Sequence, residues 1–228
     1  MKSLPDPAIL LPWIHDSLAH GENVLATSNQ GTLLLYSADE QELIIKTPMG
    51  NGLLRKARQQ TLLREYRAYQ RLHGAVGVPE CYGVLEGHFL LLEYVRGKPY
   101  REASWQDRDK WFEELLKVLK GIHARGVSHG DLKTKGNLLV SEDEQPYVID
   151  FGTAFIEKPG FHPINNWLFR LAKKLDINAW VKHKYHGRYG DASEADNELL
   201  DYSWIERVVR RLRGRPMGRL ERKGADNN

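Results

Sequence analysis

The chain has 228 residues and a formal net charge of +3, with 41% hydrophobic and 28% charged residues. These values are typical of a globular protein with a buried core, so they argue against disorder, and the small net charge gives no reason to expect a nucleic-acid partner. The single cysteine, Cys81, cannot form an internal disulfide and is expected to be a small buried hydrophobe, which fits a reducing compartment.

The sequence contains no run of 18 or more apolar residues, so no segment is expected to span a membrane. The opening segment, MKSLPDPAILLPWIHDS, has a short apolar patch that two prolines and Asp6 interrupt. It lacks the basic n-region and the long apolar core of a secretory signal peptide. We therefore expect a cytoplasmic protein.

The first third of the sequence is typical of strands joined by short turns. NVLAT (23–27) and GTLLLYS (31–37) flank the turn-like segment SNQG, and QELIIKT (41–47) follows the polar segment ADEQ. Short apolar runs bounded in this way predict a hairpin followed by a third strand. FLLLEYV (89–95) and the CYGVLEGH segment before it predict two further strands.

A helix is predicted between these two groups of strands. The segment 53–73 is rich in Ala, Leu, Arg and Gln, which favour helices. Leu62, Tyr66 and Tyr69 recur in it at helical spacing, and Gly74 ends it.

The sequence after residue 95 predicts mostly helices. One helix is expected from about residue 105 to about residue 125, opened by a capping signal at Ser104 and Asp107. NLLV and YVID predict a second short hairpin. In the last part we expect a helix whose inward face consists of Trp167, Leu168, Leu171 and Leu175.

Two aspartates lie where apolar strands meet polar segments. Asp131 is in SHGDLKTKGNLLV (128–140), and Asp150 follows YVI and precedes Phe-Gly. A carboxylate at the end of a buried strand is costly unless it is paired or binds a metal. The hairpin between the two aspartates is expected to bring them close together. Two satisfied turn aspartates are the alternative, but a pair with a lysine and an asparagine between them favours a site that holds Mg²⁺, binds phosphate and accepts a proton.

These segments resemble the motifs of the protein-kinase-like superfamily, whose catalytic loop is H-R-D-L-x-x-x-N and whose metal motif is D-F-G. This chain has H-G-D-L-K at 129–133 and D-F-G at 150–152. Lys46, at the end of the third strand, and Glu65, in the helix, match the lysine–glutamate pair of the family. The resemblance implies an α+β, bilobal protein-kinase-like fold with an antiparallel-sheet N-lobe and a reduced helical C-lobe.

The resemblance also implies a role for each matched residue in phosphoryl transfer from ATP. Asp131 would accept or orient the proton of the attacking hydroxyl, and Lys133 would neutralise charge on the transferred group. Asp150 would hold the Mg²⁺ (or Mn²⁺) that bridges the phosphates, and Asn137 would hold a second metal ion. The residues implied in nucleotide binding are Lys46, Glu65, Ser28, Gly31, Glu93 and Val95.

The chain departs from the family pattern in three places. Asn137 comes one residue late after the catalytic aspartate, which indicates an expanded loop in which Gly136 would absorb the unusual backbone. The arginine of H-R-D is replaced by Gly130, so regulation by a phosphorylated activation loop is not expected. The glycine-rich loop is reduced to Gly31, with backbone amides and the Ser28 hydroxyl left to contact a phosphate.

The segment after the D-F-G motif distinguishes between kinds of kinase. It lacks an A-P-E motif and is too short for the large helical lobe with which eukaryotic protein kinases bind peptides. H-G-D and the segment LDINAWVKHKY instead resemble small bacterial kinases of lipopolysaccharide-core sugars (heptose or 3-deoxy-manno-octulosonic acid), and also RIO-type atypical serine kinases. In these terms Asp176 resembles the buried aspartate that braces the catalytic loop, and a surface aspartate is the alternative.

Basic residues are concentrated near the end of the chain. Eight lysines and arginines lie between residues 204 and 223. A basic zone precedes them and consists of Lys173, Lys174, Lys182, His183, Lys184, His186 and Arg188. A solvated surface is one interpretation, and contact with an anionic glycolipid or with the anionic inner face of a membrane is the other.

We therefore expect a single kinase-like domain over residues 1–228, with an N-lobe at about 20–95, a C-lobe at about 100–204 and a basic tail at 205–228. Three functions remain open: a kinase of a lipopolysaccharide-core sugar, a RIO-like serine/threonine protein kinase, and a nucleotide-binding pseudokinase. The intact catalytic residues favour the first two. ATP and a hydroxyl-bearing acceptor are the expected partners, and no nucleic acid is expected.

Overall fold

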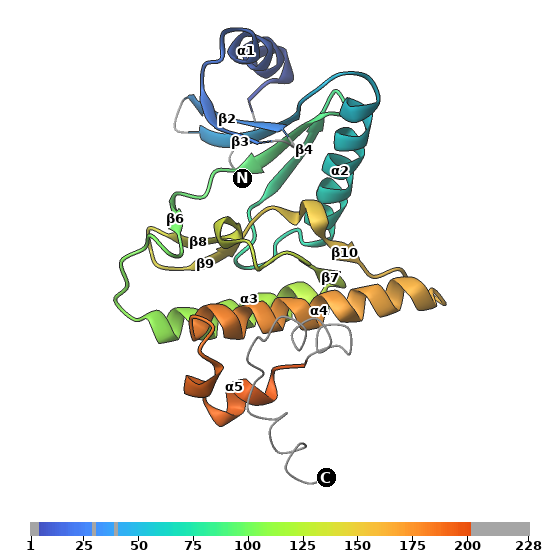
Figure 1. Ribbon diagram of the computed structural model, residues 1–228. Helices are drawn as coiled ribbons and strands as arrows, with labels where there is room; N and C mark the ends of the chain where they lie inside the picture. The colour runs from blue at the N-terminus through green and yellow to red at the C-terminus, as the bar shows by residue number, and fades with distance from the viewer. Residues whose placement is uncertain (1–4, 29–30, 39–40, 202–228) are drawn as a thin grey trace. The chain divides into compact units, whose positions relative to one another are not determined.

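The structure is a computed structural model that describes residues 5–28, 31–38 and 41–201 (Figure 1). The predicted basic tail at 205–228 lies outside the described residues. The chain divides into two compact units that alternate along the sequence. The first contains residues 1–74, 78–96 and 149–153, and the second contains residues 75–77, 97–148 and 154–228.

The first unit is built on a five-stranded antiparallel sheet in the order β1-β2-β3-β5-β4. The strands are β1 (Val24–Thr27), β2 (Gly31–Ala38), β3 (Gln41–Pro48), β4 (Cys81–Leu85) and β5 (Phe89–Glu93). All five strands predicted from the sequence are therefore present. β3 lies at the centre, where Lys46 is opposite Leu33 on one side and Leu90 on the other, so its backbone is held from both sides.

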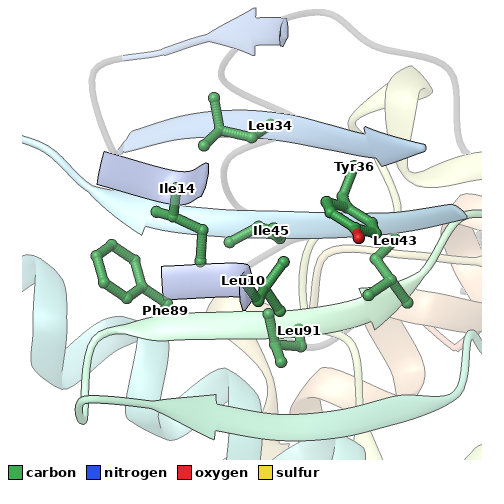
Figure 2. Close-up of a cluster of buried hydrophobic side chains, with 8 residues drawn as sticks. All are labelled: Leu10, Ile14, Leu34, Tyr36, Leu43, Ile45, Phe89 and Leu91. Carbon is green, nitrogen blue, oxygen red and sulfur yellow. The ribbon is translucent and has the colours of Figure 1, made fainter. Parts of the chain in front are cut away.

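One face of this sheet is covered by α1 (Pro7–His20). Alternate residues of β2 and β3 are buried, as the two-residue period of a strand requires. Figure 2 shows the α1 side chains together with those of β2, β3 and β5 in one apolar cluster. The cluster consists of Leu10, Ile14, Leu34, Tyr36, Leu43, Ile45, Phe89 and Leu91. Burial of these side chains stabilises the unit and attaches α1 to the sheet.

Helix α1 was not identified from the sequence, in which prolines and Asp6 interrupt the apolar patch. Pro7 occupies the start of the helix, where the missing N–H is not needed. The side chain of Asp6 caps the same end, because its Oδ1 accepts a hydrogen bond from the Ala8 N–H at 2.9 Å. Pro12 lies inside the helix and removes one intrahelical hydrogen bond. The apolar contacts with the sheet offset this loss, and they are visible only in the tertiary structure.

Helix α2 (Gly52–Arg71) contacts β3 and β4. Its buried residues are Leu62, Glu65, Ala68 and Tyr69. The predicted helix is confirmed, although Tyr66 is only half-buried. Because side chains alternate along a strand, Lys46 points away from the face that Ile45 shares with α1, and it reaches Glu65 of α2.

The second unit contains α3 (Arg108–Ala124) and α4 (Pro163–Lys184), which contact each other. The indole N–H of Trp180 in α4 donates to the backbone O of Phe112 in α3 at 2.8 Å. The two rings also pack edge to face, with centroids 6.3 Å apart. A buried tryptophan with a satisfied N–H fixes the two helices against each other.

Helix α3 begins three residues later than the sequence predicts. Asp107, and not Ser104, caps it, because the Asp107 carboxylate accepts from the Lys110 N–H at 2.9 Å. Its buried face includes Trp111, Leu115, Val118, Leu119 and Ile122.

The inward face of α4 differs from the prediction. Trp167 is 48% exposed, and Leu168, Leu171 and Leu175 are only half-buried. The buried residues are Phe169, Ala172, Asp176, Asn178, Ala179, Trp180, Val181 and His183. The buried face of α4 combines polar and small residues. A prediction that rests on large apolar side chains therefore turns the wrong side of the helix towards the interior.

Two small antiparallel sheets complete the second unit. One contains β6 (Gly97–Pro99), β8 (Leu138–Ser141) and β9 (Pro146–Val148), and the other contains β7 (Val127–Ser128) and β10 (Phe155–Ile156). The pairing of β8 with β9 confirms the predicted second hairpin. The shorter helices are η1 (Lys135–Asn137), η3 (Tyr189–Asp191) and α5 (Glu194–Glu198). In the ranges that the structure describes, no helix combines the length and the apolar character needed to cross a membrane.

Candidate active site

Lys46, Glu65 and Asp150 form an ion-pair cluster within the first unit. The Lys46 Nζ lies 2.6 Å from the Glu65 Oε1 and 3.1 Å from the Asp150 Oδ1. Glu65 comes from α2, and Asp150 precedes the short helix η2 (Phe151–Thr153). Only 18% of the Lys46 side chain and 5% of the Glu65 side chain are exposed, so water screens this pairing weakly.

The cluster controls the charge of Lys46. Burial alone would lower the pKa of the Lys46 ammonium, but attraction to Glu65 and to Asp150, with a hydrogen bond to each, raises that pKa above its ordinary value. Lys46 therefore remains positively charged throughout the physiological pH range. A fixed, permanent cation of this kind is suited to bind phosphate oxygens.

The backbone presents Asp150 in an uncommon conformation. Its φ is 65°, in the left-handed region that residues other than glycine rarely adopt, and strain of this kind is concentrated at functional sites. Phe151 is fully buried, and its ring packs edge-on against the Tyr69 ring with centroids 5.1 Å apart. This packing anchors the turn, while 45% of the Asp150 side chain remains exposed.

A cavity of about 220 Å³ adjoins the ion-pair cluster. Its lining includes Ser28, Gly31, Lys46, Thr61, Glu65 and Asp150. The Ser28 N–H donates to the Gly31 O at 2.9 Å, which closes the turn between β1 and β2. A Cβ atom at Gly31 would lie 2.1 Å from the Thr47 O, so only glycine permits this approach of β2 to β3. The structure therefore brings Ser28 and Gly31 to the same cavity as Lys46.

The positions of Glu93 and Val95 differ from those of Ser28 and Gly31, which line the cavity. Glu93 ends β5, where its N–H donates to the Glu80 O at 2.8 Å and its Oε2 accepts from the Glu80 N–H at 3.0 Å. These bonds fasten the end of β5 to the segment that precedes β4. The residues that line the cavity in the described part of the chain do not include Glu93 or Val95. Adenine contact through these two residues stays a prediction.

In the second unit, the loop after β7 is organised around Asp131. The Asp131 Oδ2 accepts a hydrogen bond from the Thr134 Oγ at 2.7 Å. The Asp131 N–H donates to the His129 Nδ1 at 3.2 Å, so Nδ1 is the acceptor nitrogen of that ring. Lys133 is exposed. The hydrogen bond from Thr134 orients the Asp131 carboxylate, and the one to His129 holds the Asp131 backbone.

Asp176 of α4 holds the same loop by its backbone. Its Oδ2 accepts from the His129 N–H at 2.8 Å, and its Oδ1 accepts from the Gly130 N–H at 2.9 Å. The His123 Nε2 lies 3.0 Å from the same Oδ2, and Asp176 is only 1% exposed. Gly130 has φ 81°, which glycine adopts without strain, and this turn lets both N–H groups point at one carboxylate. The bracing interpretation of Asp176 is therefore confirmed, and the surface alternative is wrong.

The late Asn137 lies at the end of η1. Its Nδ2 donates to the Asp131 O at 3.0 Å, and the residue is 7% exposed. The expected unusual backbone at Gly136 is wrong, because Gly136 lies in η1 without a positive φ. The extra residue is instead accommodated by the tight turn of η1, in which the Asn137 N–H donates to the Thr134 O at 3.3 Å.

A second residue of α4, His183, holds the loop on the other side of Asp131. The His183 Nε2 lies 2.7 Å from the Leu132 O, and because a carbonyl can only accept, Nε2 carries the proton. The sequence predicts that His183 belongs to the basic zone, but the residue is only 2% exposed. The signal that was missed is the seven-residue spacing from Asp176, which places both polar side chains on one helix face.

The donor types in both units fit a divalent cation. Carboxylate and amide oxygens are the ligands that Mg²⁺ and Mn²⁺ prefer; Asp150 offers a carboxylate in the first unit, and Asn137 offers an amide oxygen in the second. In the described ranges no group of three or more His, Cys, Asp or Glu side chains forms a metal cluster, so phosphate and water oxygens would have to complete the coordination. Asp150 belongs to the first unit and Asp131 to the second, so the expected proximity of the two aspartates stays a prediction.

Comparisons with known proteins place this chain in a family. The chain is 24% identical over 147 residues to the probable serine/threonine-protein kinase fnkB of Dictyostelium discoideum, which covers 60% of this chain and 26% of that protein. It is 31% identical over 101 residues to the serine/threonine-protein kinase cds1 of Schizosaccharomyces pombe, which covers 40% of this chain and 22% of that protein. It is 26% identical over 139 residues to the CBL-interacting serine/threonine-protein kinase 21 of Arabidopsis thaliana, which covers 58% of this chain and 32% of that protein. The chain thus spans about a quarter to a third of the length of these relatives.

Residues 34–164, more than half of the chain, match the protein kinase domain. This range includes the ion-pair cluster of the first unit and the Asp131 loop of the second. The α+β class and the kinase-like fold expected from the sequence are thereby confirmed. The chain belongs to the protein kinase domain family.

Proposed function

We propose that the chain is an ATP-dependent phosphotransferase that moves the γ-phosphate of ATP to a hydroxyl of an acceptor. The observation that carries the proposal is the Lys46–Glu65–Asp150 cluster beside a cavity. A lysine that two carboxylates hold in place can bind phosphate oxygens without first being ordered, and phosphoryl transfer depends mainly on such positioning. Membership of the protein kinase domain family supports the same activity.

The residues of the first unit bind the nucleotide in this proposal. Lys46 contacts the phosphates and Glu65 orients it, while Asp150 would hold the Mg²⁺ or Mn²⁺ that accompanies ATP; a second metal ion would be held by Asn137 of the second unit. The bound ion supplies neutralisation of the phosphate charge. Ser28 and Gly31 contact a phosphate from the turn between β1 and β2, and Glu93 and Val95 contact adenine.

The loop of the second unit acts on the acceptor. Asp131 orients the attacking hydroxyl and accepts its proton, and the hydrogen bond from Thr134 fixes the rotation of the carboxylate. Lys133, which is exposed, neutralises charge on the transferred group. Asp176 and His183 position this loop through its backbone and do not take part in the reaction.

The acceptor that we propose is a sugar of the lipopolysaccharide core. Only residues 153–162 connect the D-F-G segment to α4, which leaves little chain for a peptide-binding activation segment. A RIO-like serine/threonine protein kinase is the alternative, and the relatives are named as serine/threonine-protein kinases without a RIO type. A nucleotide-binding pseudokinase is the second alternative, and the complete ion-pair cluster argues against it.

We further propose that the protein is one kinase-like domain that works in the cytoplasm at the inner face of a membrane. The start of α4 supports membrane contact, because Phe161, Ile164 and Trp167 are 90%, 75% and 48% exposed. These three side chains form an exposed apolar edge, as in helices that lie at the surface of a membrane. Sedimentation with anionic vesicles should decrease when Phe161 and Trp167 are both changed to serine.

The activity is tested by transfer from γ-labelled ATP with Mg²⁺ or Mn²⁺ to purified lipopolysaccharide and, separately, to a bacterial protein extract. We expect label in the glycolipid, and we expect Asp131→Ala to abolish it. Asp16→Ala, a change of an exposed aspartate in α1, serves as the matched control. Label in protein alone would favour the protein-kinase alternative. Absence of any label that depends on Asp131 would favour the pseudokinase.

A further inference from the structure

The basic zone near the end of α4 is not one uniform surface. Lys174 pairs with Asp201 at 2.6 Å, and Lys184 pairs with Asp196 at 2.7 Å. His183 is buried and hydrogen-bonded to the Asp131 loop. Part of the charge that the sequence places here is therefore already neutralised or used within the fold.

A different group of basic side chains, which we call the arginine cluster, gathers at the C-terminal end of α4. It consists of Arg101, Arg108, His186 and Arg188. The Arg108 Nη2 donates to the His183 O at 3.0 Å, and the His186 N–H lies 3.3 Å from that same oxygen. Arg101 and Arg108 come from the connector before α3 and from its first turn, so segments far apart in the sequence meet here.

The charges of the arginine cluster are poorly compensated. Burial and then the positive charges of Arg108, Arg188 and Arg101 lower the pKa of His186 below its ordinary value, which means that these groups repel one another. Arg188 forms an ion pair with Asp191 at 2.9 Å, but both side chains are more than half exposed. In the ranges that the structure describes, no carboxylate lies within ion-pair distance of Arg101 or Arg108, and the attraction of Asp109 compensates the charge of Arg108 only from a longer distance.

Two arginines of the cluster are nevertheless held in defined positions. The Arg108 guanidinium lies 4.5 Å from the centroid of the Phe112 ring, and the Arg101 guanidinium lies 5.8 Å from that of Tyr100. The Arg101 Nε also donates to the Tyr100 Oη at 3.0 Å. Stacked guanidinium groups lose little freedom when they bind an oxyanion, and they can bind it through two N–H groups at once. His186 has φ 52°, an uncommon conformation in which strain is retained beside the arginines.

The arginine cluster is connected to the Asp131 loop by hydrogen bonds. The Tyr100 Oη, which accepts from Arg101, lies 2.7 Å from the His183 Nδ1. The His183 Nε2 in turn donates to the O of Leu132, the residue that follows Asp131. Tyr100 and His183 therefore link Arg101 to the proposed catalytic loop, so a ligand bound by Arg101 would be positioned relative to that loop.

We propose that Arg101, Arg108 and His186 form an oxyanion-binding subsite for the acceptor, which takes a phosphate or carboxylate group that the acceptor sugar carries beside its reactive hydroxyl. This proposal rests on the proposed phosphotransferase function and defines its substrate class as an anionic glycan. Attraction between the oxyanion and the guanidinium groups of Arg101 and Arg108 gives the ligand an advantage that a neutral acceptor lacks. A neutral sugar, or a serine in an uncharged peptide, would bind poorly at this subsite.

Steady-state transfer to purified lipopolysaccharide tests the subsite with Arg101→Gln. We expect the KM for lipopolysaccharide to rise about tenfold, as loss of one charge-assisted contact predicts, while kcat and the KM for ATP change less than about twofold. Arg101→Lys should restore only part of the affinity, because it retains the charge but not the two N–H groups of the guanidinium. Arg170→Gln is the matched control, since Arg170 is an exposed arginine of α4 whose Nε also makes one local hydrogen bond.

Two modified acceptors identify which oxyanion is bound. If a phosphate is recognised, dephosphorylated lipopolysaccharide should show the raised KM with the unaltered protein, and Arg101→Gln should add no further effect. If a carboxylate is recognised, carboxyl-reduced lipopolysaccharide should behave in this way instead. Equal KM values for Arg101→Gln and Arg170→Gln on the native glycolipid would overturn the subsite.

A binding measurement separates failure of the subsite from failure of the proposed function. Inorganic phosphate is titrated into the full chain while the Nε–H signals of the arginines are followed by NMR, with the Arg101 signal assigned from its loss in Arg101→Gln. We expect the Arg101 signal to shift saturably and the Arg170 signal to stay in place. If Arg101 shifts but no acceptor is phosphorylated, the anion site stands and the kinase proposal is wrong. If acceptors are phosphorylated but Arg101 shifts no more than Arg170, the subsite is wrong.

Discussion

The two units build their candidate functional groups in different ways. In the first unit, Lys46 and Glu65 lie on a strand and a helix, and their side chains meet directly at 2.6 Å. In the second unit, Asp131 lies on an irregular loop, and the groups that hold it are buried polar side chains that bind its backbone neighbours. A strand and a helix thus position Lys46 and Glu65, which we propose to act in nucleotide binding. Helix α4 instead positions the Asp131 loop, which we propose to act on the acceptor.

This difference predicts how each region fails. An ion pair between regular elements can lose one partner and still leave the elements intact. A loop that depends on one buried carboxylate loses several hydrogen bonds at once when that carboxylate is removed, because Asp176 accepts from two backbone groups and faces His123. Stability should therefore be most sensitive in the second unit, and phosphate binding most sensitive in the first.

The largest effect is expected for Asp176→Asn. The amide cannot accept all three hydrogen bonds, so buried donors lose their partner and the free energy of unfolding should fall by about 3–5 kcal/mol. Urea denaturation followed by tryptophan fluorescence measures this change. Asp191→Asn alters an exposed aspartate and is the control. A loss below about 1 kcal/mol would contradict the bracing role, because that is the range of ordinary surface substitutions.

Lys46→Met should come next. Removing the cation should lower kcat/KM for phosphoryl transfer about 10²- to 10³-fold, the cost of losing one preorganised charge. It also leaves Glu65 buried without its partner, so stability should fall, and the double change Lys46→Met with Glu65→Gln should recover stability but not activity. Lys174→Met, which breaks an exposed ion pair, should leave both quantities nearly unchanged. Recovery of activity in the double variant would show that Lys46 acts only in folding.

A smaller effect is expected where two strands of the first unit meet. Gly31→Ala places a Cβ 2.1 Å from the Thr47 O, so β2 must move away from β3, and the free energy of unfolding should fall by about 1–3 kcal/mol. Gly121→Ala is the matched control, because nothing lies within 4 Å of its Cβ in α3 and alanine favours helices. Calorimetry should show a lower Tm for the first variant and an equal or higher Tm for the second. The same decrease in both would refute the close approach.

The smallest effect concerns the single cysteine, Cys81, in β4. Burial raises the pKa of its thiol from 9.0 to about 11, so the thiol is neutral at pH 8 and alkylation by iodoacetamide should be slower than for an exposed thiol. Since the unfolded chain ionises near pH 9 and the folded chain near pH 11, this group makes stability decline as the pH rises between these values. Gly31→Ala should speed the labelling because it loosens the same sheet. A labelling rate equal to that of free cysteine would contradict the burial.

Much of the fold is readable from the sequence because its signals are local. All five strands of the first sheet and the helices α2 and α3 follow from short-range periodicity, and the order of the motifs indicates the family. Helix α1 was not predicted because its prolines disfavour a helix. Packing of Leu10 and Ile14 against the sheet stabilises it, and that contact is visible only in the tertiary structure. The buried face of α4 was assigned wrongly because its polar members are buried only through hydrogen bonds to a distant loop.

The sequence by itself determined the five strands of the first sheet, the hairpin of β8 and β9, the presence of α2, α3 and α4 and the identity of the candidate catalytic residues, since these depend on neighbours within a few positions. Only the tertiary structure decided that Asp176 and His183 hold the Asp131 loop, and that Arg101 joins His186 at the end of α4. The hydrogen bonds of Asp176 and His183 join residues that are 46 to 83 positions apart. Their formation depends on how buried polar groups find partners across the fold, and no local pattern encodes that choice.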